Sequence, residues 1–180
     1  MHIYPIYHTT VNRDERGFSL TAQKFNLALT FFYDNNSSEN AEFGLSRSAS
    51  VRSRITSSTS SSRVTLTVGD MRSYGYDKVG TSGGVTTYSA VSGGGATATL
   101  SFDGTTFTQY VNNGLQLQYS SQGAGANTFS LSKVADAEGV AQTYVYGSGV
   151  EAGLLKTVQL PGGNLVTFAY AASSPTSLLS

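Results

Sequence analysis

The chain has 180 residues, of which only 12% are charged, and its 11 Lys and Arg balance 11 Asp and Glu. A formal net charge of zero gives no overall field to attract nucleic acid or an anionic membrane, and no apolar run reaches the about 18 residues of a membrane-spanning helix. Disulfides are excluded because there is no cysteine. The 20 glycines, 11 tyrosines and 9 phenylalanines are typical of an all-β domain and argue against disorder.

The N-terminal quarter contains one clear strand. Residues 1–26 are expected to form an irregular lead segment, because they combine Pro5 with a charged cluster at 13–16. An apolar strand follows at 27–33, where Thr, Phe and Tyr favour extended backbone over helix.

Residues 46–63 are rich in Ser and Arg and are predicted to form a loop. Their four arginines are Arg47, Arg52, Arg54 and Arg63. They could contact a polyanion, but no aromatic residue alternates with them to stack on bases. The preferred interpretation is a solvated edge strand, whose charges discourage edge pairing, followed by a Ser-rich loop.

Residues 27–126 as a whole are predicted to form a β-meander that contains this loop. Turn residues recur about every 8 to 12 positions, which is the spacing of consecutive antiparallel hairpins. Beyond the loop, and continuing into the C-terminal part, the predicted strands are 64–68, 72–76, 85–88, 96–102, 105–111, 115–119, 128–134, 140–146, 154–160 and 165–170.

Residues 127–172 contain two copies of one block, 24 residues apart, at Leu131–Tyr146 and Leu155–Tyr170. Each copy is predicted to be a hairpin, and the tail 173–180 adds no further one. Because each unit of a repeat must bury its apolar face against its neighbours, the two hairpins are expected to lie side by side. The residues that define the repeat are Val134, Asp136, Gly139, Tyr144 and Tyr146 in the first copy, and Val158, Gly163, Phe168 and Tyr170 in the second.

These blocks resemble the units of bacterial YD-repeat (Rhs-type) proteins, in which a Val, an Asp-x-x-Gly turn and a strand ending in Tyr-x-Tyr-Asp follow one another. Gly147 and Ala171 replace the last Asp, so the units are degenerate. Segments 11–20 and 27–35 resemble, more weakly, the part that precedes such repeats. The resemblance implies the opening, N-terminal segment of a secreted protein whose repeats form a shell around a toxic domain.

The paired aromatic residues of the repeat have two interpretations. Tyr144 and Tyr146 are two positions apart on one strand, as are Phe168 and Tyr170, so each pair shares a face. The pairs could stack as a core layer. Alternatively they could grip a sugar, with hydrogen bonds from a polar segment. The candidate ligand-contact residues of that segment are Gln109, Asn112, Asn113, Gln116 and Gln118.

The sequence predicts no catalytic residue, metal site or cofactor. His2 and His8 are the only histidines, and no spacing of His, Cys and carboxylates provides the three or four ligands of a zinc site. Asp136 and Glu138 form a carboxylate pair, but an Asp in a turn usually caps its own backbone. The protein is therefore expected not to be an enzyme.

The sequence thus predicts an all-β fold of consecutive antiparallel hairpins, as one curling sheet or two layers, repeat-like in its C-terminal half. The leading hypothesis is a structural wall segment of a secreted or cell-surface bacterial YD-repeat protein, although no export signal is visible. Its partners would be neighbouring repeats, or copies of the chain joined through open strand edges. The alternative is an adhesin or fibre module that binds glycans or a host surface.

Overall fold

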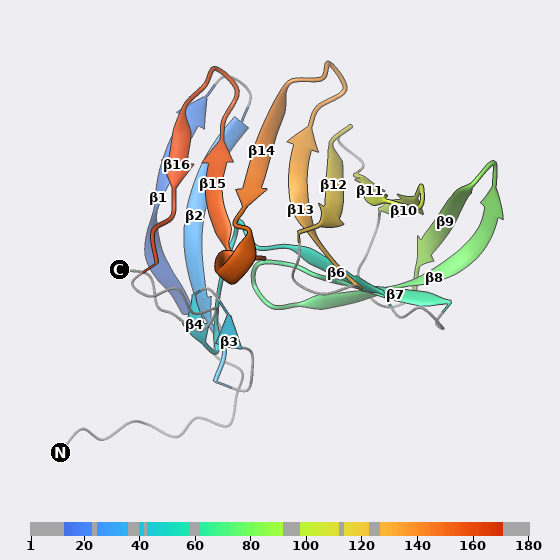
Figure 1. Ribbon diagram of the computed structural model, residues 1–180, viewed down its shortest axis with the longest axis horizontal. Helices are drawn as coiled ribbons and strands as arrows, with labels where there is room; N and C mark the ends of the chain where they lie inside the picture. The colour runs from blue at the N-terminus through green and yellow to red at the C-terminus, as the bar shows by residue number, and fades with distance from the viewer. Residues whose placement is uncertain are drawn as a thin grey trace.

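The structure, a computed structural model, describes residues 13–22, 25–35, 40–41, 43–57, 62–91, 98–111, 114–122 and 127–170 (Figure 1). These residues form sixteen strands and one short 3₁₀ turn, so the predicted all-β class is confirmed. Within this described part, no helix has the length and apolar character needed to cross a bilayer.

The largest sheet has eleven strands and curls until part of it closes into a barrel. Each strand of the barrel pairs antiparallel with the next along the chain, and β13 then pairs with β6, where Phe129 faces Ile55. The result is an up-and-down barrel of eight strands. These strands are β6 (Arg54–Ser57), β7 (Arg63–Thr67), β8 (Ser73–Ser82), β9 (Val85–Ala90), β10 (Thr99–Phe102), β11 (Thr106–Tyr110), β12 (Gln116–Ser121) and β13 (Thr128–Ala135).

Strand β13 changes its partner part-way along one edge. Thr128–Ser130 pair with β6, whereas Lys133–Ala135 pair with β14 (Ala141–Tyr146). The sheet then continues through β15 (Leu155–Gln159) to β16 (Leu165–Thr167). We call the point where β6 and β14 diverge from β13 the fork. The 3₁₀ turn Gly149–Glu151 lies between β14 and β15.

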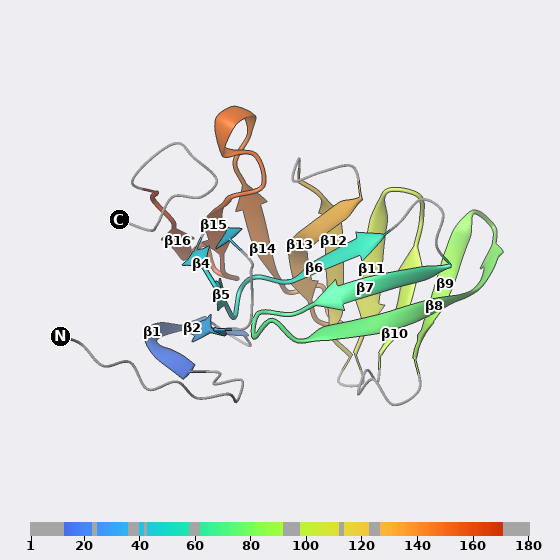
Figure 2. The ribbon, with the colours of Figure 1, turned by 90° about the horizontal axis from the view of Figure 1, so that it is seen from below.

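A second sheet packs against this extension. It contains β1 (Arg13–Ala22), β2 (Phe25–Tyr33) and β5 (Arg47–Ala49), and a short hairpin of β3 (Asn40–Ala41) and β4 (Gly44–Leu45) lies between β2 and β5 in the chain. Figures 1 and 2 together show β1 and β2 in a separate layer from β15 and β16. The ring of Phe43 joins the layers, with centroids 5.7 Å from Phe31 and 6.4 Å from Phe168.

One continuous core runs from this sandwich into the barrel. Inward and outward residues alternate along the barrel strands, so that in β7 Val64 and Leu66 are buried between less buried neighbours. One end of the barrel is filled by aromatic rings: Phe107 stacks on Phe102 at 4.2 Å and meets Phe129 edge-on at 4.9 Å. This packing fills the barrel at that end.

Two predictions about the N-terminal half are wrong. The lead segment 1–26 is not irregular throughout, because β1 pairs along β2, whose backbone supplies hydrogen bonds whatever the side chains are. The predicted loop 46–63 contains β5 and β6. Its Ser and Arg content hides an alternation in which Val51, Ser53 and Ile55 are buried.

Candidate functional site

The two repeated hairpins have the same register. Val134 pairs with Gln142 in the first hairpin, and 24 residues later Val158 pairs with Val166 in the second. The turns match too: the N–H of Gly139 donates to the Asp136 carbonyl at 3.1 Å, and the equivalent bond between the second copy's residues 163 and 160 has the same length. The sequence repeat is therefore also a repeat of backbone pairing.

The last tyrosine of each copy forms the same long-range hydrogen bond. The Tyr146 hydroxyl donates to the Leu131 carbonyl at 2.8 Å, and the Tyr170 hydroxyl donates to the Leu155 carbonyl at 2.7 Å. Leu131 lies at the fork, where β13 passes from β6 to β14. Tyr146 thus satisfies a backbone carbonyl at the point where the strand pairing changes.

The other residues that define the repeat serve its core and turns. Tyr144 and Phe168 are 8% and 5% exposed, so their rings lie in the core and do not form an exposed row. Val158 is fully buried and Val134 packs against the same core.

The turn residues Gly139 and Gly163 have φ of 83° and 92°, in the region that favours glycine. The Asp136 carboxylate accepts hydrogen bonds from the N–H groups of Glu138 and Val140, both at 2.9 Å. Asp136 therefore caps its own turn, which gives its carboxylate a structural role.

A cavity of about 390 Å³ lies at the barrel end opposite the aromatic cluster. We call it the barrel-end cavity. It reaches from the barrel interior to the inner face of β14, because Tyr144 contributes to its wall. Its apolar wall includes Leu66, Leu117, Leu131 and Val134, and its polar wall includes Ser53, Tyr76, Gln109, Tyr119 and Tyr144.

The polar wall of the barrel-end cavity is a connected hydrogen-bond network. The Gln109 amide donates to the Tyr76 hydroxyl and accepts from the Tyr119 hydroxyl, both at 3.1 Å. Tyr119 also lies 3.3 Å from the Ser53 hydroxyl. Burial raises the pKa values of Tyr76, Tyr119 and Tyr144, so all three keep their protons at neutral pH.

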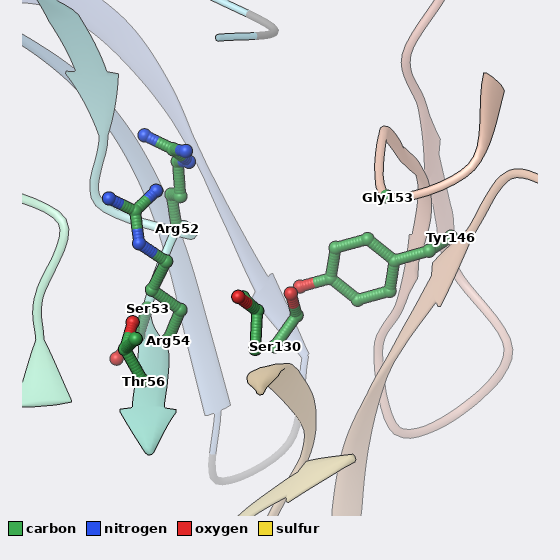
Figure 3. A pocket seen from close by; sticks show the side chains of 8 residues that line it. Arg52, Ser53, Arg54, Thr56, Ser130, Tyr146 and Gly153 are labelled. Carbon is green, nitrogen blue, oxygen red and sulfur yellow. The ribbon is translucent and has the colours of Figure 1, made fainter. Parts of the chain in front are cut away.

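A second, more polar pocket of about 280 Å³ lies at the fork (Figure 3). Arg52 and Arg54 lie on one side of it, and the hydroxyl groups of Ser130 and Tyr146 approach from the other. Arg52 and Arg54 are two positions apart on the outward face, which is why both side chains reach the same pocket. No acidic side chain is among the described residues that line this pocket.

The glutamines predicted to contact a ligand do not form one surface. Gln109 is 9% exposed and points into the barrel, at the level of Leu117 on the next strand. Gln116 and Gln118 flank Leu117 on β12 and are half-buried on the opposite face. Asn112 and Asn113 lie outside the described residues.

The barrel-end cavity was not predicted from the sequence. Tyr76 and Tyr119 are aromatic residues in strands, which is equally typical of a plain core. Only barrel closure brings them together with Ser53 on β6 and Gln109 on β11. In the described part of the chain, no group of three His, Cys, Asp or Glu side chains could hold a metal ion.

Comparison with models of protein families and with curated protein sequences finds no match. Among solved structures, the chain is similar to the N-terminal domain of effector protein SpvB from Salmonella typhimurium strain LT2. The TM-score is 0.59 and the identity 14%, over 95% of this chain and 70% of that chain. At this identity the similarity concerns the fold, and it carries over no activity, ligand or partner.

Proposed function

We propose that this chain is a non-catalytic structural β module, a wall segment of a secreted or cell-surface bacterial YD-repeat protein of the toxin-encapsulating type. The observation that carries the proposal is the repeated hairpin. Its strand register, its turn hydrogen bond and its tyrosine hydrogen bond all occur again 24 residues later. Units that repeat in this way extend a sheet by adding one hairpin to the edge of the last.

The edge of β16 is suited to accept such an addition. The Phe168 N–H donates inward to the Lys156 carbonyl, and the Asn164 carbonyl accepts from Leu160, both at 2.8 Å. Because hydrogen-bonding direction alternates along an antiparallel strand, the N–H and C=O of Leu165 and Thr167 point away from β15. Among the described strands, β16 has no partner on that side.

Other observations support a structural role over a catalytic one. The Arg63 guanidinium, for example, holds both carboxylate oxygens of Asp77 across the neighbouring strands β7 and β8, at 2.6 and 3.0 Å. The fold is similar to that of the N-terminal domain of effector protein SpvB, which is compatible with a module of a larger protein.

The glycan-binding alternative has less support. It needs the polar segment to present its amides together, and Gln109 lies on the opposite face of the sheet from Gln116 and Gln118. The repeat tyrosines are also engaged in the core or in hydrogen bonds to backbone carbonyls.

Small-angle scattering on the chain, eluted from a sizing column over a range of concentrations, tests the wall-segment proposal. A compact monomer of this length has a radius of gyration of about 16 Å. We expect association that grows with concentration, and we expect Thr167→Pro to suppress it, because proline removes an outward N–H without breaking the bonds to β15.

The matched control is Thr87→Pro in β9, a strand that pairs on both sides. This substitution should lower the stability of the barrel, whereas Thr167→Pro should change association alone. A particle that stays monomeric and compact at every concentration, with the same profile for Thr167→Pro, would contradict the proposal.

A further inference from the structure

The barrel-end cavity has the size and position of a small-molecule site. Its volume of about 390 Å³ falls within the range of roughly 300–1,000 Å³ that is usual for ligand pockets. Barrels of eight strands can hold one small ligand, and the mouth of a barrel is a common place for it. Here the aromatic rings of Phe102, Phe107 and Phe129 fill the opposite end of the barrel, so the cavity is closed on that side.

Two of the tyrosines that line the cavity have hydroxyls that accept a hydrogen bond from the protein and have no protein acceptor for their own proton among the described residues. Tyr76 accepts from the Gln109 amide at 3.1 Å, and Tyr144 accepts from the Gln142 amide at 2.8 Å. The amides fix the position of each hydroxyl oxygen and leave its O–H available to donate. The cavity therefore presents oriented O–H donors, which a ligand with a hydrogen-bond acceptor would complement.

The charge of the wall limits the class of ligand. The described side chains that line the cavity are apolar, hydroxyl, phenol or amide groups, and none of them is charged. An ion in such a place would lose its hydration without a counter-charge, at a large cost in free energy. The protonated state of Tyr76 and Tyr144, which burial favours by raising their pKa values, keeps the wall neutral.

We propose that the barrel-end cavity binds a small neutral molecule with an apolar body and a hydrogen-bond-accepting oxygen, such as a ketone or ester carbonyl. Leu66, Leu117 and Leu131 contact the body of the ligand. Its oxygen accepts a hydrogen bond from the Tyr76 or the Tyr144 hydroxyl. This site is independent of the edge of β16 and adds a binding function to the structural one.

The test is a fluorescence titration of the full chain with prodan, a neutral naphthyl ketone whose emission reports the polarity and hydrogen bonding around its carbonyl. A second titration uses the analogue in which a methylene group replaces the carbonyl. We expect prodan to bind with one molecule per chain. Tyr76→Phe or Tyr144→Phe should weaken prodan binding about three- to tenfold, the worth of one hydrogen bond, and leave the analogue unaffected.

Two controls keep the result tied to the cavity. Tyr110→Phe changes a tyrosine that is 46% exposed on the outer face and should leave the titration unchanged. Val111→Trp places a large ring at a residue that lines the cavity and should block binding. Thermal unfolding shows whether each variant is folded, and Tyr144→Phe carries the test where Tyr76→Phe does not fold.

Three results would overturn the proposal. Prodan could fail to bind up to its solubility limit. It could bind equally well to Val111→Trp, which would place the probe elsewhere on the chain. Finally, prodan and its analogue could lose affinity equally in both tyrosine variants, which would show that neither hydroxyl donates to the carbonyl.

Discussion

At the scale of single residues, the tyrosines of the repeat stabilise strand junctions. Tyr146 and Tyr170 each donate to the carbonyl of the leucine 15 residues earlier, Leu131 and Leu155. Both rings are half-buried against the core, and the hydroxyl at the end of each ring bonds to the backbone. Because the same hydrogen bond occurs at two equivalent positions, its contribution to the free energy of unfolding can be measured twice in one protein and compared.

We expect Tyr146→Phe and Tyr170→Phe each to lower the free energy of unfolding by about 1 kcal/mol, because each leaves a backbone carbonyl without its donor. Urea denaturation followed by tyrosine fluorescence or circular dichroism measures both changes. Tyr110→Phe, on an exposed ring, is the control and should have little effect. No change in either repeat variant would mean that these bonds add nothing to stability.

At the scale of elements, one glycine determines how the β7–β8 turn meets the N-terminal sheet. A Cβ atom built on Gly69 would clash with the Ala49 carbonyl oxygen and would lie 2.7 Å from the Ser50 Cα. Both contacts are with backbone, which cannot rotate away as a side chain can. The turn therefore packs directly on the segment that leads from β5 to β6.

We expect Gly69→Ala to destabilise the fold by about 1–3 kcal/mol, the usual cost of forcing extra volume into a packed site. Gly80→Ala is the matched control, because a Cβ there meets no atom within 4 Å and Gly80 does not have a positive φ. Thermal or urea unfolding of the two variants compares them. Equal stabilities would contradict the close approach of the turn.

At the scale of the whole molecule, the barrel and the sandwich share one core. Phe168 from the second repeat contacts Phe43, which in turn contacts Phe31 of the N-terminal sheet. Because the layers bury the same side chains, we expect the described sheets to unfold together as one cooperative unit.

Phe168→Ala should therefore lower the free energy of unfolding by about 3–5 kcal/mol, as expected for a buried phenylalanine, and still give a single transition. Coincident curves from tyrosine fluorescence and far-ultraviolet circular dichroism would establish this. Two separate transitions, with only one of them moved by Phe168→Ala, would show instead that the two sheets are stable independently.

The local features of the chain were predictable. All ten strands from β7 to β16 overlap the segments predicted for them, since strand residues and turn residues alternate there at hairpin spacing. By contrast, the residues of β1 show no strand pattern of their own, and the serine and arginine content around β6 obscures its alternation of buried and exposed residues. Both form because a neighbouring strand offers a backbone partner, β2 for β1 and β7 and β13 for β6.

The sequence by itself determined the all-β class, the strands of the C-terminal two-thirds and the 24-residue repeat, because alternation, turn residues and glycines with positive φ act over a few neighbouring positions. Only the tertiary structure decided that Phe129 pairs with Ile55 and closes the barrel. Every strand presents the same N–H and C=O groups, so its distant partner depends on how the whole core packs. That closure brings Tyr76, Gln109 and Tyr119 together around a cavity that no local pattern predicts.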